Sequence, residues 1–529
     1  MGRDTTPRTA VPGRGFALAA ACLLIAAESA VAQCGDPLAG PCCSPHDNGF
    51  CSSQGCCELI CNTIDPFCCV QIWDSACAAI AVEVCGGLCA NDYLPEPSLQ
   101  QNAAYGVAVD WSEGPGSGID PLVAVGSYLR SIEDPPLANA GSMSILRRID
   151  GEWVDEALLF PEPPIAATYF GRSVAVMQGP VVDVAIAGAY RDSQVGPANN
   201  QRGAAHVFVS SEPGTWTAST VLRPGSGAVN TEWFGFSVDA GHVPTVNADQ
   251  ITVGAPRAGF SNRGAVYIFG RSGKAWNQLA KVVPPNSSSY NSSQFGWSIG
   301  FEPDLLTGLN GVPLSQPQKL LIVGAPGYSS ERGRVFVQER RTAENWQNSV
   351  NKTITIGGLQ AGDRYGEAVA VASRFVAIGI PGRFEGRGGV QMWERIGNTS
   401  SNWKIRTLIL DDDAIPGTRF GSAVSMREWG NGQILLAVGA KGDSTEGPAT
   451  GAVSFYLWTP GDSGYDWIFL GKRHSVAPED GAQFGFAVAA GDIETVVGVP
   501  FQNTTIIDPD PKPHPVTLWN TGAVEGVFP

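Results

Sequence analysis

The sequence predicts a mainly β chain in which a seven-bladed β-propeller follows a small, disulfide-rich, helical module. An aromatic residue followed by glycine recurs seven times, at intervals of 55 to 70 residues. Glycine (65 residues) and proline (38) make up about a fifth of the 529 residues, which favours many short strands joined by turns. All thirteen cysteines precede residue 90, so the cross-linked part and the repeated part are separate.

Residues 1–32 are predicted to be a signal peptide. Three arginines precede an apolar run over 16–27, and small residues at 30–32 suit cleavage. A transmembrane anchor is the alternative, but a span needs about 20 apolar residues. A lipid-modified cysteine is a second alternative, but Cys34 follows Gln33, where a small residue is expected. We therefore expect a product that starts near Gln33, is secreted or held at the cell surface, and has no membrane span.

Residues 33–90 are predicted to form a disulfide-linked module. An even number of cysteines in a short exported segment is typical of a domain held together by disulfides, here up to six that the sequence does not pair. Zinc is the alternative, but the segment has one histidine, His46, and oxidation competes for thiols outside the cell. The cysteine spacing from Cys56 onward is closer to a helical period than to strand alternation, so we expect short helices. The twelve cysteines are Cys34, Cys42, Cys43, Cys51, Cys56, Cys57, Cys61, Cys68, Cys69, Cys77, Cys85 and Cys89.

Residues 105–529 are predicted to form the propeller, with 91–104 as a linker or closing strand. Each aromatic-glycine pair opens an alternating segment such as 234–238, in which small residues beside valine suit a packed inner strand. An apolar second strand then ends in Gly-Ala-Pro or a degenerate copy of it, as at 254–256, and a third strand follows. The repeat-defining glycines are Gly106, Gly171, Gly235, Gly296, Gly366, Gly421 and Gly485.

Tryptophan marks a fourth strand in six of the units. Each lies 17 to 19 residues before the next aromatic-glycine pair, and this constant phase predicts a core position rather than a sugar-stacking surface. A unit of four short strands cannot bury its faces alone, so seven units should close into a ring. The seventh outer strand lacks its tryptophan, and either 94–104 or 522–528 could complete that blade. The six are Trp153, Trp216, Trp276, Trp346, Trp403 and Trp467.

Two resemblances attach to these motifs. The aromatic-glycine and Gly-Ala-Pro pattern resembles the FG-GAP repeat of integrin α-subunit propellers over about 425 residues, and the tryptophan strand resembles its bacterial version. The runs Asp65–Cys69 and Trp73–Cys77 resemble a cysteine-rich module of secreted proteins from environmental bacteria, particularly planctomycetes, which carries no established activity. The propeller resemblance implies extracellular binding or adhesion, with a protein or glycan as partner.

The sequence departs from the integrin pattern in its loops. None of the seven has the calcium-binding form Asp-x-Asp-x-Asp-Gly, so we expect no calcium and no other cofactor. The nearest acidic cluster, Asp411–Asp413, is interpreted as a solvated turn. The longest insertions, at 241–250, 302–317 and 502–515, are expected to be irregular and to carry the binding surface on one rim.

Charge and motifs narrow the function further. A formal net charge of −16 argues against a nucleic-acid partner. The histidines have no metal-ligand spacing, and there is no nucleophile elbow or phosphate-cradling loop, so no catalytic, cofactor-binding or metal residue is predicted. We expect a non-catalytic binding or adhesion protein. A secreted propeller enzyme acting on polysaccharide, or a structural protein of the envelope, is the alternative, and the ligand and oligomeric state are left open.

Overall fold

The computed structural model divides the chain into two compact units, Met1–Cys89 and Ala90–Pro529. The expected signal peptide and the cysteine module, with its helices and disulfides, lie outside the described residues and stay predictions. The structure describes residues 93–95 and 100–527, apart from gaps at 113–119, 150–151, 194–200, 226–230, 244–247, 286, 308–312, 341–345, 347–351, 397–401, 430–431, 461–466, 492–493 and 509–513.

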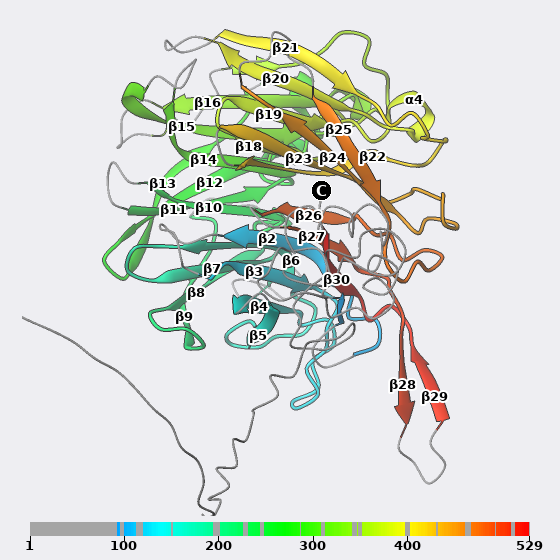
Figure 1. Ribbon diagram of the computed structural model, residues 1–529. Coiled ribbons are helices and arrows are strands. Elements are labelled where there is room, and N and C mark those ends of the chain that lie inside the picture. Colours follow the sequence, from blue (N-terminus) through cyan, green and yellow to red (C-terminus); the bar gives the residue numbers. More distant parts are fainter. Residues whose placement is uncertain are drawn as a thin grey trace, which may run out of the picture. The chain divides into compact units, whose positions relative to one another are not determined.

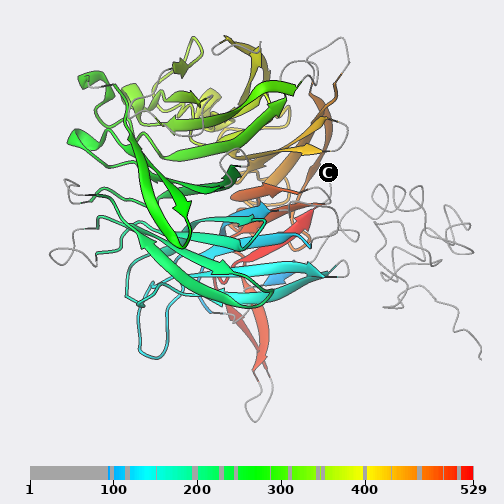
Figure 2. The same ribbon diagram turned by 90° about the vertical axis from the view of Figure 1, so that its left-hand side faces the viewer.

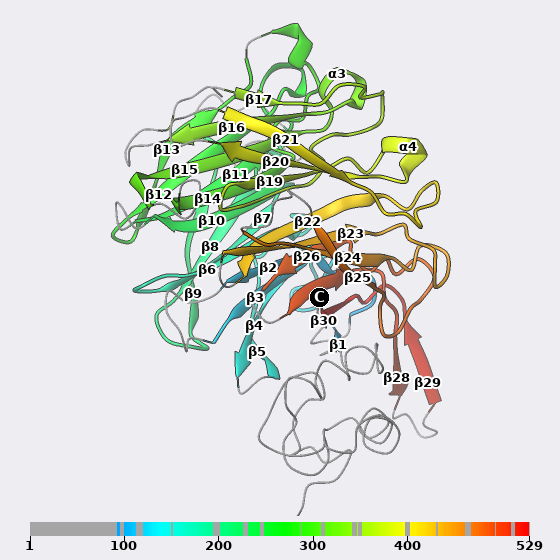
Figure 3. The ribbon, with the colours of Figure 1, turned by 45° about the horizontal axis from the view of Figure 1, so that its top comes forward.

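The described unit is a seven-bladed β-propeller, as the repeats predict. Each blade is a four-stranded antiparallel sheet. The seven inner strands contact one another in chain order, and the last contacts the first, so the sheets form a closed ring. In Figures 1 and 3 the red strands β26 and β27 of the last blade return beside the blue strand β2 of the first.

The strands of the first six blades follow the chain from the inside of the ring outward. Blades 1 to 3 comprise β2 (Tyr105–Ser112), β3 (Leu122–Ser127), β4 (Ser142–Ile149) and β5 (Glu152–Leu159); β6 (Phe170–Gln178), β7 (Asp183–Ala189), β8 (Ala204–Ser210) and β9 (Trp216–Leu222); and β10 (Ser237–Val243), β11 (Ala248–Ala255), β12 (Ala265–Ser272) and β13 (Ala275–Val282). Blades 4 to 6 comprise β14 (Ser298–Thr307), β15 (Pro313–Ala325), β16 (Arg334–Arg340) and β17 (Lys352–Ile354); β18 (Val369–Ala372), β19 (Phe375–Gly379), β20 (Val390–Ile396) and β21 (Asn402–Ile409); and β22 (Phe420–Trp429), β23 (Gln433–Ala440), β24 (Ala452–Trp458) and β25 (Ile468–Arg473). Single turns of helix, η6 (Phe260–Asn262), η7 (Ser288–Tyr290), α3 (Tyr328–Glu331) and α4 (Arg383–Gly386), lie in the loops.

The seventh blade closes the ring with strands from both ends of the unit. Its inner strands are β26 (Ala487–Ala490) and β27 (Thr495–Val499), its third strand is β30 (Ala523–Val527), and β1 (Tyr93–Pro95) pairs antiparallel with β30 as the outer strand. The two segments that the sequence offered for this blade are therefore both used. This arrangement explains why the seventh tryptophan position is empty.

Glycine recurs because the backbones of adjacent blades touch. A Cβ on Gly188, in the second strand of blade 2, would lie 1.9 Å from the carbonyl oxygen of Gly235 in blade 3, where no Cβ fits. Gly235 itself has a φ of +85°, a conformation that favours glycine. All seven repeat-defining glycines have φ between +83° and +90°. The second-strand glycines that meet the next blade in this way are Gly126, Gly188, Gly254, Gly324, Gly379, Gly439 and Gly498.

The hydrophobic cores lie between adjacent blades. The aromatic residue of each pair is buried, and one core joins Leu122 of blade 1 to Phe170 and Phe208 of blade 2. The tryptophans of the outer region also face the preceding blade: Trp153 and Trp346 are buried, and Trp216 packs at the edge of the blade 1 core. Burial between sheets makes each blade depend on its neighbours for stability.

The three insertions predicted to be irregular form β-hairpins in the part that is described. Residues 241–250 belong to β10 and β11, 302–317 to β14 and β15, and 502–515 to an added hairpin of β28 (Thr504–Asp508) and β29 (His514–Leu518). This hairpin projects away from the blades (Figures 1 and 2). Long excursions pair with themselves because their backbone groups need hydrogen-bond partners.

The prediction that the insertions share one rim is wrong. Within a blade the strands alternate in direction, so the turn between the first and second strands lies at the end opposite the aromatic-glycine pair. The hairpins at 241–250 and 302–317 therefore lie on one rim, whereas β28 and β29 leave from the other.

No helix in the described part of the chain is long and apolar enough to cross a membrane.

Candidate functional site

A channel of about 310 Å³ runs along the ring axis, and every blade contributes to its wall. The three residues after each repeat glycine line it in rings, of which the second is small and the third is apolar. The first ring varies and lies at the end of the channel where the inner strands begin, which we call the mouth. Its members are Val107, Arg172, Phe236, Trp297, Glu367, Ser422 and Phe486.

A repeated turn sets a second residue beside each member of the first ring. The residue before the aromatic has a positive φ in every blade. In blades 2 to 7 its carbonyl accepts the N–H of the residue after the glycine, as from Phe236 to Trp233 at 3.2 Å. Because all seven blades share this strained backbone, it belongs to the turn rather than to one site. The turn residues are Ala104, Tyr169, Trp233, Gln294, Arg364, Arg419 and Gln483.

Aromatic side chains form a continuous arc around the blade 1 to blade 4 side of the mouth. Neighbouring ring centroids in the arc lie 4.5 to 5.8 Å apart. Most of these rings are half-buried, so they keep some accessible surface. The arc runs through Tyr128, Tyr169, Tyr190, Trp233, Phe236 and Trp297.

Cations lie over these rings. The guanidinium of Arg172 is 4.8 Å from the ring centre of Phe236, and that of Arg257 is 3.8 Å from the ring centre of Trp233. Across the channel, the ammonium of Lys441 lies 4.6 Å from the ring centre of Phe486. Such contacts stabilise a cation by roughly 0.5–2 kcal/mol and do not neutralise its charge.

Arg172 and Lys441 have no anionic partner at contact distance. Neither side chain makes an ion pair or a hydrogen bond with any of the described residues. The mouth has one carboxylate among its lining residues, Glu367, which is held by Arg364, and Arg364 also contacts Glu331 at 3.0 Å. The mouth is therefore positively charged, although the whole chain carries a formal charge of −16.

The pKa values record this excess of positive charge. Burial lowers the pKa of Lys441, and the nearby guanidinium groups of Arg419, Arg172 and Arg364 lower it further, whereas Glu367 opposes them. Burial also lowers the pKa of Arg172. Both cations would gain from an anion that replaces the water they have lost.

On two inner strands, the residue that follows the channel-lining segment is an aspartate whose carboxyl group links adjacent blades. Asp110 accepts the backbone N–H of Val176 in blade 2 at 2.8 Å, and Asp239 accepts that of Phe301 in blade 4 at 2.8 Å. Ser425 makes the same bond from blade 6 to blade 7. Burial raises the pKa of Asp110 to about 7 and raises that of Asp239, to which the charge of Asp110 contributes.

A second cavity, of about 250 Å³, lies on the opposite rim between blades 2 and 3. Nδ1 of His242 lies 2.8 Å from Asp249, and Arg271 contacts the other oxygen of that carboxylate at 3.0 Å. Among the described residues that line it, none carries a hydroxyl or thiol nucleophile. The cluster therefore lacks the third member of a hydrolytic triad.

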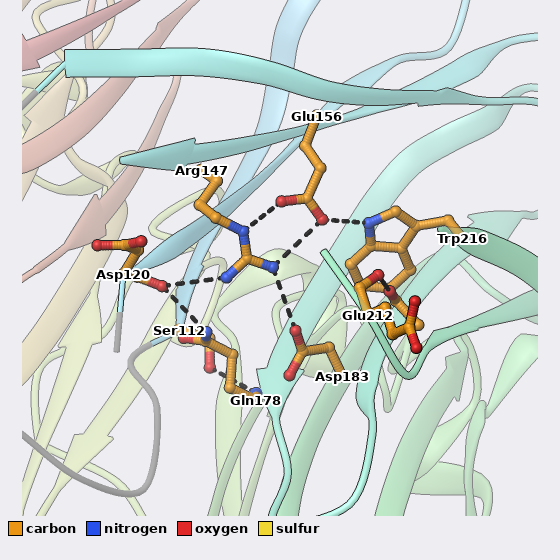
Figure 4. Close-up of polar contacts among 9 residues, drawn as sticks. Ser112, Asp120, Arg147, Glu156, Gln178, Asp183, Glu212 and Trp216 are labelled. Atoms are coloured by element: carbon orange, nitrogen blue, oxygen red, sulfur yellow. Dashed lines mark hydrogen bonds and ion pairs between the residues drawn. The ribbon is translucent and has the colours of Figure 1, made fainter. Parts of the chain in front are cut away.

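The same rim carries buried ion pairs that join blades, which we call latches. Figure 4 shows the first of them: Arg147 of β4 holds Glu156 of β5 in its own blade and reaches Asp183 of β7 in the next blade at 3.3 Å. The indole N–H of Trp216 donates to Glu156 at 2.6 Å. Although burial raises the pKa of Glu156, the hydrogen bonds from Arg147 and Trp216 outweigh burial and hold it below its usual value.

The same tryptophan position contacts the preceding blade in other units. In three more units the indole N–H donates to a side chain of the preceding blade, whereas the indole nitrogens of Trp276 and Trp467 have no partner among the described residues. The donations run from Trp153 to Glu494 at 2.6 Å, from Trp346 to Gln250 at 3.1 Å and from Trp403 to Glu339 at 2.8 Å. The constant phase thus reflects contact between blades.

The described residues contain no group of three or more His, Cys, Asp or Glu side chains that could hold a metal ion. In the acidic cluster interpreted as a solvated turn, Asp412 and Asp413 are exposed. Asp411 differs, because it is buried and pairs with Lys472 at 2.8 Å.

Sequence reasoning missed the mouth. The signal was present, because aligning the seven repeats on their glycines gives a column, from Val107 to Phe486, that varies between conserved neighbours in the pattern.

Comparisons with known proteins give a limited result. No protein-family model matches the chain, and a search of curated proteins found no match. Among solved structures, the α-L-arabinanase of Penicillium chrysogenum complexed with arabinobiose aligns with 62% of this chain and 88% of its own, at 11% identity and a TM-score of 0.38. A match at that level carries no argument about function, so the chain is identified by its geometry as a seven-bladed propeller with a cationic, aromatic channel mouth.

Proposed function

We propose that the chain is an exported, non-catalytic binding protein of the FG-GAP type, which recognises an extracellular protein or glycan at the channel mouth. One observation carries the proposal: Arg172 and Lys441 lie among aromatic rings and pair with no carboxylate of the described residues, in a chain whose net charge is strongly negative. Cavities of a few hundred Å³ with aromatic walls and a few convergent polar groups are typical ligand sites.

The test is a binding screen. The purified, oxidised full chain is applied to a glycan array and to cell surfaces, with and without EDTA. We expect saturable binding that EDTA does not change. Loss of binding in EDTA would contradict the absence of a metal, and no saturable binding to either surface would contradict the proposed function.

A second candidate is a hydrolase acting on polysaccharide within the channel. It is favoured by the raised pKa of Asp110, about 7, because a protonated carboxyl can serve as a general acid. Against it, Asp110 and Asp239 both accept hydrogen bonds from the next blade, which holds them in a structural role. Release of new reducing ends from polysaccharide by the wild-type chain, absent from Asp110→Asn, would favour the hydrolase.

A further inference from the structure

We infer that the channel mouth binds a carboxylated saccharide, with its carboxylate between Arg172 and Lys441 and its sugar rings against the aromatic arc. This inference rests on the proposed function and names the class of ligand. Arg172 comes from blade 2 and Lys441 from the loop after β23 of blade 6, so they flank the mouth from two sides. The two charges are close enough to interact, because the guanidinium of Arg172 helps to lower the pKa of Lys441, and an anion placed between them would be attracted by both.

The positive charges of Arg172 and Lys441 are not neutralised by any carboxylate of the described residues. Several cations enclosed elsewhere are paired with carboxylates: Arg147 with Glu156, and Lys472 with Asp411 and Asp443. Arg172 and Lys441 differ, since no described carboxylate touches either one. Leaving two neighbouring cations half-buried and unpaired costs stability, and a bound carboxylate would offset that cost through charge-assisted hydrogen bonds.

The other groups at the mouth leave the charge balance positive. Arg364 and Glu367 neutralise each other, and Arg419 adds a further exposed cation. Glu331 pairs with Arg364 at the edge and is itself largely exposed. A neutral ligand would leave Arg172 and Lys441 uncompensated, so the site favours an anion.

The aromatic surroundings favour a saccharide over other anions. Phe236 and Trp297, whose ring centres are 4.5 Å apart, line the cavity on one side, and Phe486 lines it on the other. The apolar C–H faces of sugar rings pack well on such side chains. The arc continues outward through Trp233 and the tyrosines, so a chain of several sugar units would find further rings. A cavity of about 310 Å³ limits the part that enters the channel to a small terminal portion.

The test is a calorimetric titration of the full chain with a panel of uronate trisaccharides: galacturonate, mannuronate and guluronate. The comparison ligands are the matching neutral hexose trisaccharides and a glutamate hexapeptide. We expect at least one uronate to bind, its neutral counterpart to bind at least about tenfold more weakly, and binding to weaken at high salt.

Two substitutions and two matched controls locate the site. Lys441→Met and Arg172→Gln should each weaken uronate binding by about tenfold or more, because each removes one charged contact. Lys281→Met and Arg383→Gln should have no effect, since those cations also lie over rings, at 5.0 Å from Tyr267 and 4.9 Å from Phe384, but not at the mouth. Circular dichroism checks that each variant is folded.

Three results would overturn the inference. Equal binding of uronate and neutral sugar would remove the role of charge, and uronate binding unaffected by both mouth substitutions would place the site elsewhere. Binding of the glutamate peptide alone would assign the mouth to an acidic protein. In each case saturable binding in the array screen would leave the proposed function standing, whereas no saturable binding anywhere would overturn both.

Discussion

The buried cation of the first latch and the cations that line the mouth are used differently in this propeller. On the rim where the inner strands end, Arg147 is enclosed by Glu156, Asp183 and a backbone carbonyl. At the mouth, Arg172 lies over an aromatic ring and contacts no carboxylate in the part of the chain that the structure describes. The difference shows how a structural cation can be told from a ligand-binding one. A buried cation in an ion pair holds blades together, whereas a cation beside a cavity with no carboxylate partner can bind an anionic ligand.

The largest difference in the free energy of unfolding is expected when a latch is removed. Glu156→Ala leaves the buried Arg147 without its main partner, and removing one member of a buried ion pair costs about 3–5 kcal/mol in the free energy of unfolding. Arg172→Gln should cost less than about 1 kcal/mol, because no pair is broken. Urea unfolding followed by tryptophan fluorescence measures both. An equal decrease in the free energy of unfolding in the two variants would contradict the distinction between the latch cation and the mouth cations.

A smaller effect is expected at the indole donors. Trp216→Phe removes a hydrogen bond to the Glu156 carboxylate and should lower the free energy of unfolding by about 1.5–3 kcal/mol. Trp276→Phe is the matched control, because that indole nitrogen is buried without a partner, and its loss should be under about 1 kcal/mol. If the control cost as much as the test, ring packing and not hydrogen bonding would account for the tryptophan position.

The smallest effect concerns pH and the carboxyl groups between the rims. Burial raises the pKa of Asp110 to about 7, so the folded chain holds this proton more tightly than the unfolded chain does. Its contribution to stability is complete below about pH 4, the ordinary range of an aspartate, and is lost as the pH rises through 7. Asp110→Asn should therefore reduce the loss of stability between pH 4.5 and 7.5, measured as the shift of the urea midpoint.

Asp239 and Glu525, whose pKa values burial also raises, act in the same direction, so the Asp110→Asn variant should keep part of the slope. Ser425→Ala serves as the control, because it removes the equivalent bond between blades without a titrating group. An identical pH slope in wild type and Asp110→Asn would show that Asp110 does not titrate in this range.

The blades could be predicted from sequence because their signals are local. Gly188 and Gly235 are required by backbone contacts that repeat in each unit, so they appear as a period along the chain. The latches could not be predicted, because Arg147 meets Asp183 only after two blades pack side by side. The mouth depends equally on closure, since Arg172 and Lys441 lie 269 positions apart along the chain.

The conformation of the insertions could not be predicted from the sequence. Their length indicated irregular loops, yet β28 and β29 pair with each other over five positions. Which rim each insertion occupies followed only from strand direction within its blade.

The three-residue strand β1 has a mechanical consequence. Every other outer strand follows the third strand of its own blade along the chain, whereas β1 comes from the other end of the unit and, among the described residues, pairs with β30 at Tyr93, Leu94 and Pro95. A pull on the chain ahead of Tyr93 would act on those few bonds first. The seventh blade would then lose its outer strand before the inner strands that close the ring, β2 and β26, came under load.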